Sequence, residues 1–531
     1  MSVLSEYIFS STNIVVIGFF ALFLYAGCSS VVVNIKDIDP KHLPKGREIP
    51  SFIPQDTTLG KVYAKELEAH KGESGALLLD DGTQALLHRV ALTRMAQKSI
   101  FLQSYIYKDE IASKIFMHEL WKAANRGVQV RILIDDNGLD SDFSDIITLD
   151  SHPNIQVKIF NPYKNRSRFL RYPEMVYDFN RINHRMHNKI FVVDDIALII
   201  GGRNVADDYF DNNTHLNFTD TDVVFVGEVA KSATKSFMAY WDYERSIPAT
   251  LLPSKRSMKS YLKEIKAISQ RIATQPSGFI KYDTTIRSFV QQYTTKRFDM
   301  AWGRAVFIAD APDKIEKIHQ RRPITDALKQ IFSRTKSDVY IAAAYLVPGK
   351  HALGDLSSLK NRKISINVLT NSLASTDSLV VYAAWERYRD NFLKNGVRVY
   401  EYQYEGKNKK NGRKKSGVRG KLSSGASLHS KTIVFDERIT WVGSFNLDQR
   451  SSNLNTESVV IFENSEFAKK TKANIQAEMS DAWELWSVDG ETFWRGYNKD
   501  GVFEIHNTPP NANIFLRLFN VLAKILPEDQ V

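Results

Sequence analysis

Apolar residues along this chain switch between helical and extended spacing, and the switching predicts an α/β protein. An apolar pattern at helical spacing over residues 85–95 leads into an extended apolar run at Ser99–Tyr107. A second helical pattern at Ile111–Asn125 and a second apolar run at Val128–Ile134 follow. Short strands separated by longer helices are typical of mixed sheets with helices on both faces. This region therefore predicts one α/β/α unit.

The same order of elements occurs again in the second part of the chain. Helical spacing over residues 324–331 precedes an apolar run at Val339–Leu346, a further helical region and a run at Ile364–Leu369. The recurrence predicts two similar α/β/α halves. A polar stretch between about residues 255 and 310, with Pro276 and Gly278, is where we expect the boundary. We therefore expect one domain over residues 34–270 and a second over residues 271–531.

A polar pattern is repeated with identical spacing, once in each half. Both copies read H-x-K-x4-D-x6-G-[GS]-x-N. The first copy consists of His187, Lys189, Asp194, Gly201, Gly202 and Asn204, and the second of His429, Lys431, Asp436, Gly443, Ser444 and Asn446. Two matched sets are far less probable by chance than one histidine. They indicate one active site built from two halves.

The residue types in this pattern suit displacement at a phosphodiester. Met186–Val193 and Leu428–Phe435 read as strands, on which His and Lys two positions apart share one face. One imidazole attacks phosphorus and forms a phosphohistidine, while the other transfers protons to and from the alcohols. The two lysines, with Asn204 and Asn446, neutralise the phosphoryl oxygens, and the small Gly202 and Ser444 allow close approach of the backbone.

The duplicated motif resembles that of the phospholipase D superfamily. The resemblance implies two α/β/α halves forming one site at their interface, supporting roles for Asp194 and Asp436, and His187 as nucleophile with His429 as acid and base. The sequence itself does not decide between the two histidines. Members of the superfamily orient each histidine with a downstream acid, which Glu457 matches, 28 residues after His429. The same offset after His187 falls on His215, so Asp220 or Asp222 is the expected substitute, and we take Asp222 as the candidate.

Several segments narrow the resemblance to bacterial cardiolipin synthases of the C-type class. They are Thr58-Leu59-Gly60, Leu102–Tyr107, Asn183–Lys189, Leu369–Asp377 and Gly443–Ser451. The resemblance implies an enzyme that transfers a phosphatidyl group to phosphatidylglycerol. A hydrolytic phospholipase D is the alternative, and a nuclease is a less favoured one, so we expect phospholipid partners and no nucleic acid. No zinc-type or phosphate-loop signature is present, and we expect neither a metal nor an organic cofactor.

The N-terminal segment, residues 1–33, predicts a connection to the membrane. Ile14–Ala26 is uninterrupted apolar sequence, and Cys28, the single cysteine, follows it. Leu24–Cys28 resembles a bacterial lipobox, with Cys28 as the lipidated residue. An uncleaved anchor continuing to Val33 is the alternative. Either interpretation places the protein at the bacterial cell envelope.

Charge and a C-terminal apolar stripe add two further candidates for surface contact. The net charge of +11 favours anionic partners, and its densest basic cluster lies at Lys407–Lys421. That cluster fits equally well a segment that binds an anionic bilayer and a solvated loop insertion. Ile514–Ile525 has helical apolar spacing, which fits an interfacial helix, although packing against a core is the more common explanation and the one we favour.

Overall fold

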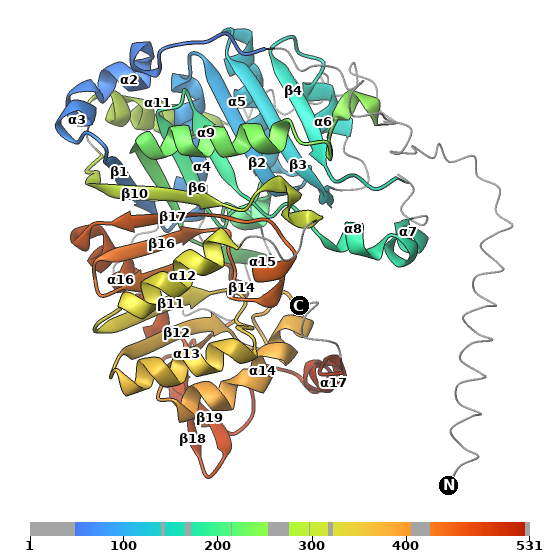
Figure 1. Ribbon diagram of the computed structural model, residues 1–531, viewed down its shortest axis with the longest axis vertical. Helices are drawn as coiled ribbons and strands as arrows, with labels where there is room; N and C mark the ends of the chain where they lie inside the picture. The colour runs from blue at the N-terminus through green and yellow to red at the C-terminus, as the bar shows by residue number, and fades with distance from the viewer. Residues whose placement is uncertain are drawn as a thin grey trace, which may run out of the picture.

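The computed structural model describes residues 48–139, 144–164, 171–213, 215–252, 276–296, 298–316, 322–404 and 425–525 (Figure 1). The first half contains the strands β1 (Ser74–Leu79), β2 (Ser99–Tyr107), β3 (Gln129–Leu139), β4 (Ile155–Phe160), β5 (Ile190–Val193), β6 (Ala197–Gly201), β7 (Leu216–Thr219), β8 (Asp222–Gly227) and β9 (Ser246–Pro248). Its helices are α2 (Thr58–Val62), α3 (Ala64–Ala69), α4 (Gly82–Met95), α5 (Ile111–Asn125), α6 (Ser144–Leu149), α7 (Arg171–Tyr177), α8 (Phe179–Asn183), α9 (Glu228–Trp241) and α11 (Pro276–Thr294).

The second half repeats this arrangement and adds a C-terminal hairpin and helix. Its strands are β10 (Ala301–Ala309), β11 (Asp338–Ala343), β12 (Ser365–Asn371), β13 (Arg398–Tyr402), β14 (Gly425–Leu428), β15 (Lys431–Phe435), β16 (Ile439–Gly443), β17 (Ser458–Glu463), β18 (Trp483–Val488), β19 (Glu491–Tyr497) and β20 (Phe503–His506). Its helices are α12 (Pro323–Arg334), α13 (Lys350–Asn361), α14 (Leu379–Lys394), α15 (Gln449–Asn453), α16 (Ser465–Ser480) and α17 (Ile514–Ala523).

A single mixed sheet runs through both halves of the molecule. The halves join where β1 pairs with β10, with Ala76 opposite Ala301. Outward from this junction the first half has the order β8–β6–β5–β2–β3–β4–β9. The second half has the equivalent order β17–β16–β15–β11–β12–β13–β18. The duplicated α/β/α fold expected from the sequence is thus confirmed, and the junction places the two motif-bearing hairpins near each other.

Helices cover both faces of the sheet in each half (Figure 1). In the first half α4, α5 and α11 pack on one face and α9 on the other. Strand β8 shows why: Val224 and Val226 face the first set, whereas Val223 and Phe225 face α9. In the second half α12, α13 and α14 pack on one face and α16 on the other. Strands buried on both faces have continuous apolar sequence, as these do.

The motif strands are shorter than the sequence predicts. Strand β5 begins at Ile190 and β15 at Lys431, so His187, Lys189 and His429 lie in the segments that lead into the strands. These segments bond both to their own half and to the other half of the molecule, as Ser430 does to Ala344 and His429 to Thr219. In the second copy Lys431 Nζ lies 3.2 Å from His429 Nδ1, so the pair is in contact although its histidine precedes the strand.

Helix α17 departs from the expected packing against a core. Its only buried residue is Asn520, while large apolar side chains such as Phe515 (68% exposed) and Ile525 (82% exposed) face outward. The expectation of a core-packing helix is wrong, because the helix buries only a polar residue and leaves most of its apolar stripe exposed.

Several sequence expectations fall outside the described residues. They concern the segment 1–33 with Cys28, the basic cluster Lys407–Lys421 and the division at residues 270 and 271. Just after that division, α11 packs against α4 of the first half, where Tyr293 Oη lies 2.6 Å from His88 Nδ1. Within the described ranges no helix combines the length and the apolar composition needed to cross a bilayer.

Candidate active site

Each motif histidine is held by the backbone of the opposite half. The His187 N–H donates to the carbonyl oxygen of Thr456 at 2.8 Å, and the His429 N–H donates to that of Thr219 at 2.7 Å. A parallel bridge between Met186 and Thr456 and the parallel pairing of β14 with β7 extend these contacts. The two motif segments are thus fixed across the interface between the halves.

The residue before each histidine is fixed by its own half. The Met186 N–H donates to Asp135 Oδ2 at 2.9 Å, and the Leu428 N–H donates to Asn371 Oδ1 at 2.9 Å. Asp135 lies in the second half of β3 and Asn371 at the end of β12, which are equivalent strands. Neither residue belongs to the repeated motif, so the motif did not identify them. A polar residue after an apolar strand run was the available signal.

The acids that orient the histidines are exchanged between the halves. Glu457 of the second half lies against His187 of the first, with both carboxylate oxygens 3.0 Å from Nδ1. Asp220 of the first half lies against His429 of the second, with Oδ2 2.7 Å from Nδ1. Each acid directly follows the threonine whose carbonyl receives the histidine N–H. One short segment from each half therefore supplies both contacts to the opposite histidine.

Asp222, the expected orienting acid of the first half, has a different role. Its Oδ2 accepts a hydrogen bond from Arg89 Nη2 at 2.9 Å and lies 3.5 Å from Arg203 Nη1. Asp220 takes the place beside a histidine. Asp220 follows His187 by 33 residues and Glu457 follows His429 by 28. The different offsets explain why a fixed spacing did not identify the first-half acid.

The acids also explain the difference between Gly202 and Ser444. A Cβ atom on Gly202 would lie 2.4 Å from Asp220 Oδ2, so only glycine leaves room for that carboxylate. Ser444 instead donates from Oγ to Glu457 Oε2 at 2.5 Å. Ser451 donates to the other oxygen, Oε1, at 2.8 Å. The small residues expected to admit a phosphate thus accommodate or bind the orienting acids.

The charge state of each histidine follows from its burial and its acid. Burial lowers the pKa of His187 to about 4, although the Glu457 carboxylate opposes this. Burial, followed by the charge of Lys431, lowers the pKa of His429 well below its usual value. Burial alone would raise the pKa of Glu457, but His187 and Lys189 outweigh it, so this pKa is lowered. An ionised Glu457 only accepts hydrogen bonds, which puts the His187 proton on Nδ1 and leaves Nε2 as a free nucleophile.

The two motif lysines fold back on their own segments. Lys189 Nζ donates to the His187 carbonyl oxygen at 2.8 Å, and Lys431 Nζ donates to that of His429 at 2.6 Å. Both are buried, and burial lowers the pKa of Lys189 to about 7 and also lowers that of Lys431. Two ammonium groups with lowered pKa values beside two neutral imidazoles favour binding of an anion, because an anion stabilises their charged forms.

Asp194 and Asp436 stabilise turns and do not contact the histidines. Asp194 accepts hydrogen bonds from the backbone N–H groups of Gln97, Lys98 and Ser99 at 2.7–2.9 Å. Asp436 accepts from those of Lys336, Ser337 and Asp338, and from Ser337 Oγ. Both aspartates have positive φ, as do the residues that follow them, which is the geometry of a type I′ hairpin turn. They fasten the motif hairpins to the starts of β2 and β11.

Asparagines and aromatic side chains complete the surroundings of the histidines. Asn204 Oδ1 accepts from the Ile106 N–H at 3.0 Å, and the Asn446 N–H donates to Ser451 Oγ at 3.3 Å. Tyr105 packs edge-on to His187 with ring centroids 4.9 Å apart, and Tyr209 packs edge-on to His429 at 5.1 Å. Phe218 also packs against His429, with ring centroids 5.1 Å apart, so each imidazole lies against aromatic side chains.

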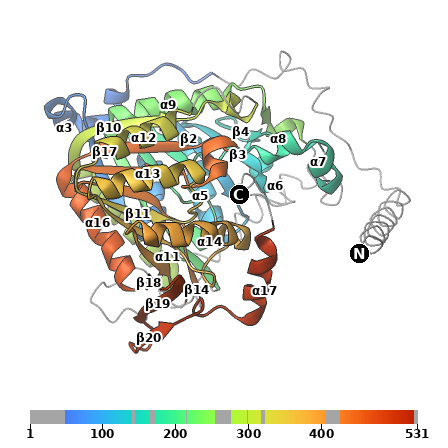
Figure 2. The ribbon, with the colours of Figure 1, turned by 60° about the horizontal axis from the view of Figure 1, so that its bottom comes forward.

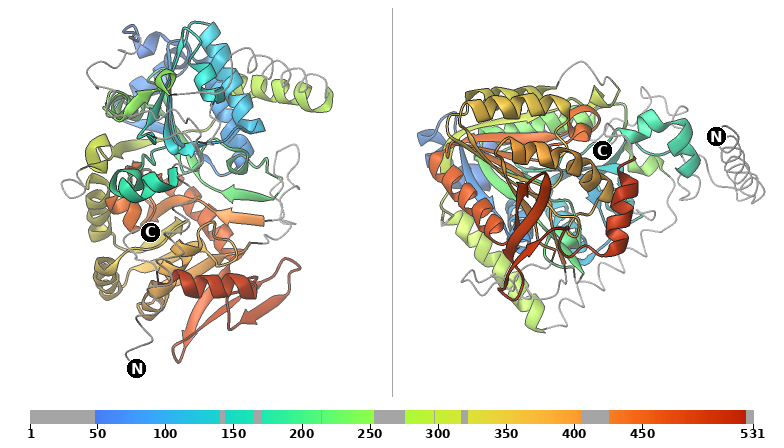
Figure 3. Two further views of the ribbon diagram at one scale, coloured as in Figure 1. Left: turned by 90° about the vertical axis from the view of Figure 1, so that its right-hand side faces the viewer. Right: turned by 90° about the horizontal axis from the view of Figure 1, so that it is seen from below.

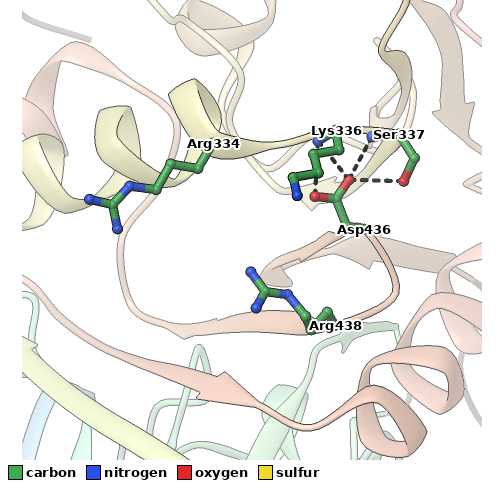
Figure 4. A pocket seen from close by; sticks show the side chains of 5 residues that line it. All are labelled: Arg334, Lys336, Ser337, Asp436 and Arg438. Carbon is green, nitrogen blue, oxygen red and sulfur yellow. Dashed lines mark hydrogen bonds between the residues drawn. The ribbon is translucent and has the colours of Figure 1, made fainter.

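A surface pocket of about 410 Å³ lies beside the Asp436 turn, lined also by Arg334, Lys336, Ser337 and Arg438 (Figure 4). It is at the opposite end of β15 from His429, about 20 Å along the strand at 3.3 Å per residue. Arg438 pairs with Glu463 at 2.7 Å, and Asp436 contributes negative charge. This pocket is separate from the histidine site. Within the described ranges no group of three or more histidine, cysteine or acidic side chains is arranged to hold a metal ion.

Comparison with known proteins identifies relatives of both halves. The model of the family described as "Cardiolipin synthase, PLD-like domain" matches residues 90–241 and 328–479. Each match contains one motif, and together they span more than half of the chain.

Whole-chain relatives agree with this family. Over 471 residues the chain is 32% identical to cardiolipin synthase C of Escherichia coli (strain K12), covering 86% of this chain and 96% of that protein. It is 42% identical over 513 residues to an uncharacterised protein of Helicobacter pylori (strain ATCC 700392 / 26695), covering 97% of this chain and 99% of that protein. The crystal structure of phosphatidylserine synthase from Haemophilus influenzae Rd KW20 has a TM-score of 0.51 at 12% identity, covering 79% of this chain and 91% of that one. That likeness supports the fold.

Proposed function

Because this chain belongs to the family of cardiolipin synthase PLD-like domains and is an enzyme of the phospholipase D superfamily, we propose that it transfers a phosphatidyl group to phosphatidylglycerol at a membrane surface. The observation that carries the proposal is the exchanged pairing of His187 with Glu457 and of His429 with Asp220. Two oriented imidazoles and two buried lysines then act on one phosphate. The coarser activity, phosphatidyl transfer among phospholipids, fits the relatives. We propose in addition that phosphatidylglycerol is the acceptor and that the reaction passes through a phosphohistidine intermediate.

In the first step, His187 Nε2 attacks the phosphorus of the donor phospholipid. A P–N bond forms, and the bond from phosphorus to the head-group oxygen breaks. His429, in its protonated form, gives its proton to the leaving alkoxide, so the head group departs as an alcohol. Glu457 keeps the His187 proton on Nδ1 and stabilises the positive charge that the attacked imidazole acquires.

Protonation of His429 depends on the substrate. Without an anion, burial and the charges of Lys431 and Lys189 hold its pKa low. A phosphodiester between the lysines offsets their charge, and this raises the pKa of His429 towards its usual value. The acid for the first step is therefore generated when the lipid phosphate binds.

In the second step, neutral His429 removes the proton from the terminal hydroxyl group of phosphatidylglycerol. That oxygen attacks phosphorus, the P–N bond breaks and His187 is regenerated. Water in place of the lipid alcohol would give phosphatidic acid, the product of a hydrolytic phospholipase D. A nuclease remains the less favoured alternative, since cardiolipin synthase C of Escherichia coli is a relative over most of the chain.

The location at the membrane rests on the N-terminal sequence and the substrate. The apolar run Ile14–Ala26 and Cys28 suit a lipoprotein or an anchor of the cell envelope. A phosphatidyltransferase also has to reach lipids that stay in a bilayer. We therefore propose an envelope-bound enzyme with Cys28 as the candidate lipidation site.

The decisive experiment is lipid analysis by mass spectrometry. Purified full-length protein is incubated with vesicles of phosphatidylglycerol and phosphatidylethanolamine, with His187→Ala as the control. We expect new cardiolipin with wild type only, and the released free head group identifies the donor. Phosphatidic acid without cardiolipin would assign the hydrolase, and cleavage of plasmid DNA with no lipid product would assign the nuclease.

The order of the histidines has its own test. In a His429→Asn variant given a phosphatidyl donor whose leaving group needs no proton, such as p-nitrophenolate, the intermediate should form and persist, because no base activates the acceptor. Peptide mass spectrometry after a rapid quench should then find the phosphatidyl group on His187. No adduct on His187 in the His429→Asn variant, together with an adduct on His429 in the reciprocal His187→Asn variant, would reverse the assignment.

A further inference from the structure

Helix α17 presents most of its large apolar side chains to the outside, and the residue that it buries against the protein is polar. Asn520 is the only buried residue of the helix, and its Nδ2 donates to Glu386 Oε2 of α14 at 2.8 Å. Lys524 Nζ bonds to the same carboxylate oxygen at 2.7 Å. The outward face carries Ile514, Phe515, Leu518, Phe519, Leu522 and Ile525, each more than half exposed. A helix against water normally has the reverse orientation.

A second set of exposed apolar side chains lies on the helices that precede the first motif. These are Met175, Val176, Tyr177 and Phe179 of α7 and α8, exposed by 37–75%. Helix α8 ends at Asn183, four residues before His187. Arg450 of α15 donates to Asn183 Oδ1 at 2.7 Å, and α15 closely follows the second motif. The second set is therefore attached directly to the segments that carry both histidines.

The two sets lie on the same side of the molecule. In Figure 1, α7, α8 and α17 all occupy the right-hand edge, with α15 between them in height. Figure 2 and both views of Figure 3 keep α7 and α17 on this side, and the left view of Figure 3 looks onto the face that bears them. Large apolar side chains that are exposed together on one side of a molecule are typical of an interaction face.

We propose that this face, formed by α17 and α7–α8, docks on a phospholipid bilayer so that the histidine site meets lipid head groups. This inference rests on the proposed function, because an enzyme that acts on phospholipids is expected to contact a bilayer, whereas the exposed apolar side chains alone would also fit a protein partner. The apolar side chains enter the zone between head groups and acyl chains, as those of interfacial helices do. The net charge of +11 favours an anionic bilayer such as one rich in phosphatidylglycerol.

The docking face also accounts for the inverted helix. Asn520 and Lys524 both bond to Glu386, so polar contacts hold the helix on the protein and its apolar side chains are left for another partner. Its apolar side chains then exchange water for lipid on docking, which is favourable in proportion to the apolar area removed from water. Docking at α7–α8 at the same time orients the motif segments towards the bilayer.

The test measures depth in the membrane, because the full chain also carries the apolar run Ile14–Ala26 and would sediment with vesicles in any case. Cys28 is the only cysteine, so Cys28→Ser allows a fluorophore at one introduced site: Phe519→Cys, Val176→Cys, or Val306→Cys on β10 as the control. Vesicles of phosphatidylglycerol and phosphatidylethanolamine carry a nitroxide on an acyl chain. We expect quenching at positions 519 and 176 and little at 306. Equal, weak quenching at all three positions would overturn the proposal, as would labels at 519 that report on each other between protein copies without added lipid.

Activity gives an independent readout. Phe515→Ser/Phe519→Ser is compared with Ile53→Ser/Val306→Ser, which changes two exposed apolar residues elsewhere (62% and 38% exposed). We expect the α17 variant to lose about tenfold in turnover on vesicles and to match wild type on monomeric short-chain phospholipids. Equal loss on both substrates would contradict docking and indicate damage to the fold. Wild type inactive on both substrates, with quenching at 519 retained, would refute the proposed function and leave the docking face standing.

Discussion

At the scale of single residues, Glu457 shows how one side chain serves two parts of the molecule. Its carboxylate binds His187 from the other half and receives Ser444 and Ser451 from its own. Replacing one oxygen by an amide group keeps the size of the side chain and removes its charge. Such a change therefore separates two effects of Glu457, which are the orientation of the His187 ring and the protonation of that ring.

We predict that Glu457→Gln lowers kcat roughly 10²–10⁴-fold with little change in KM, because the imidazole loses the anion that stabilises its charged form. The control is Glu463→Gln at the end of β17, the strand that follows Glu457; Glu463 is a partly exposed acid paired with Arg438. Steady-state kinetics on mixed vesicles measures both. An unchanged kcat for Glu457→Gln would contradict the orienting role.

The titration of His187 is predicted to lie far below the usual range for histidine. Its pKa of about 4 means that the ring is neutral throughout pH 5–8 and gains a proton only towards pH 4. Because the Glu457 carboxylate raises this pKa, Glu457→Gln should lower it further. Nitrogen NMR of labelled histidine measures the midpoint. A midpoint for His187 between pH 6 and 7 in the free enzyme would refute the prediction.

Asp220 and Asp222, two residues apart, are predicted to fail in different ways. Asp220→Asn should reduce turnover through His429 with little change in Tm. Asp222→Asn leaves buried Arg89 without its carboxylate partner and should cost about 3–5 kcal/mol of unfolding free energy. Activity assays and denaturant unfolding of both variants separate the effects, and the reverse assignment of losses would be inconsistent with the geometry.

At the scale of elements, the motif hairpins are fastened by their turn aspartates. Asp194 and Asp436 hold equivalent turns, each through three backbone N–H groups. This repetition indicates that the aspartate of each motif fixes the position of the motif hairpin, whereas the histidine and the lysine take part in the reaction.

Asp194→Ala is predicted to destabilise the fold by about 1–3 kcal/mol, because buried backbone donors lose their acceptor. Asp194→Asn, which keeps an acceptor oxygen, should lose less. Thermal unfolding measures the stability, and turnover per folded molecule should stay within a few-fold of wild type. A complete loss of activity in a fully folded Asp194→Asn variant would show that the aspartate takes part in the reaction.

At the scale of the whole molecule, the site exists only because two halves of one chain share a sheet. Strand β1 of the first half pairs with β10, which in turn pairs with β17 of the second half. The junction brings Glu457 to His187 and Asp220 to His429 across 270 and 209 residues of sequence. Each half thus lacks the acid for its own histidine.

A mixture of two inactive chains is therefore predicted to stay inactive. His187→Ala and His429→Ala proteins, combined at equal concentration, should show no recovery of turnover, because every chain assembles its own site. The same mixture unfolded and refolded together serves as the check for exchange of halves. Recovery without refolding would mean that the site forms between chains.

Local pattern alone determined much of this protein. The sequence predicts β2 and α5 with the bounds that the structure has, because the apolar period of each element is set within the element. The two motif copies and the duplicated α/β/α fold were also legible, since identical spacing in both halves is a property of the chain. These features depend on residues that are near one another in sequence.

Only the tertiary structure decided which acid serves which histidine and where α17 lies. The pairings of Glu457 and Asp220 follow from the order of strands around the β1–β10 junction, which no local spacing encodes. The orientation of α17 depends on the hydrogen bond from Asn520 to Glu386, which belongs to a helix distant in sequence. The amphipathic pattern of α17 alone does not determine whether its apolar face packs against the protein or faces outward. Contacts between segments that are distant in sequence are fixed by packing of the whole chain. For that reason the sequence predicts the type of reaction, but it does not predict which acid pairs with which histidine.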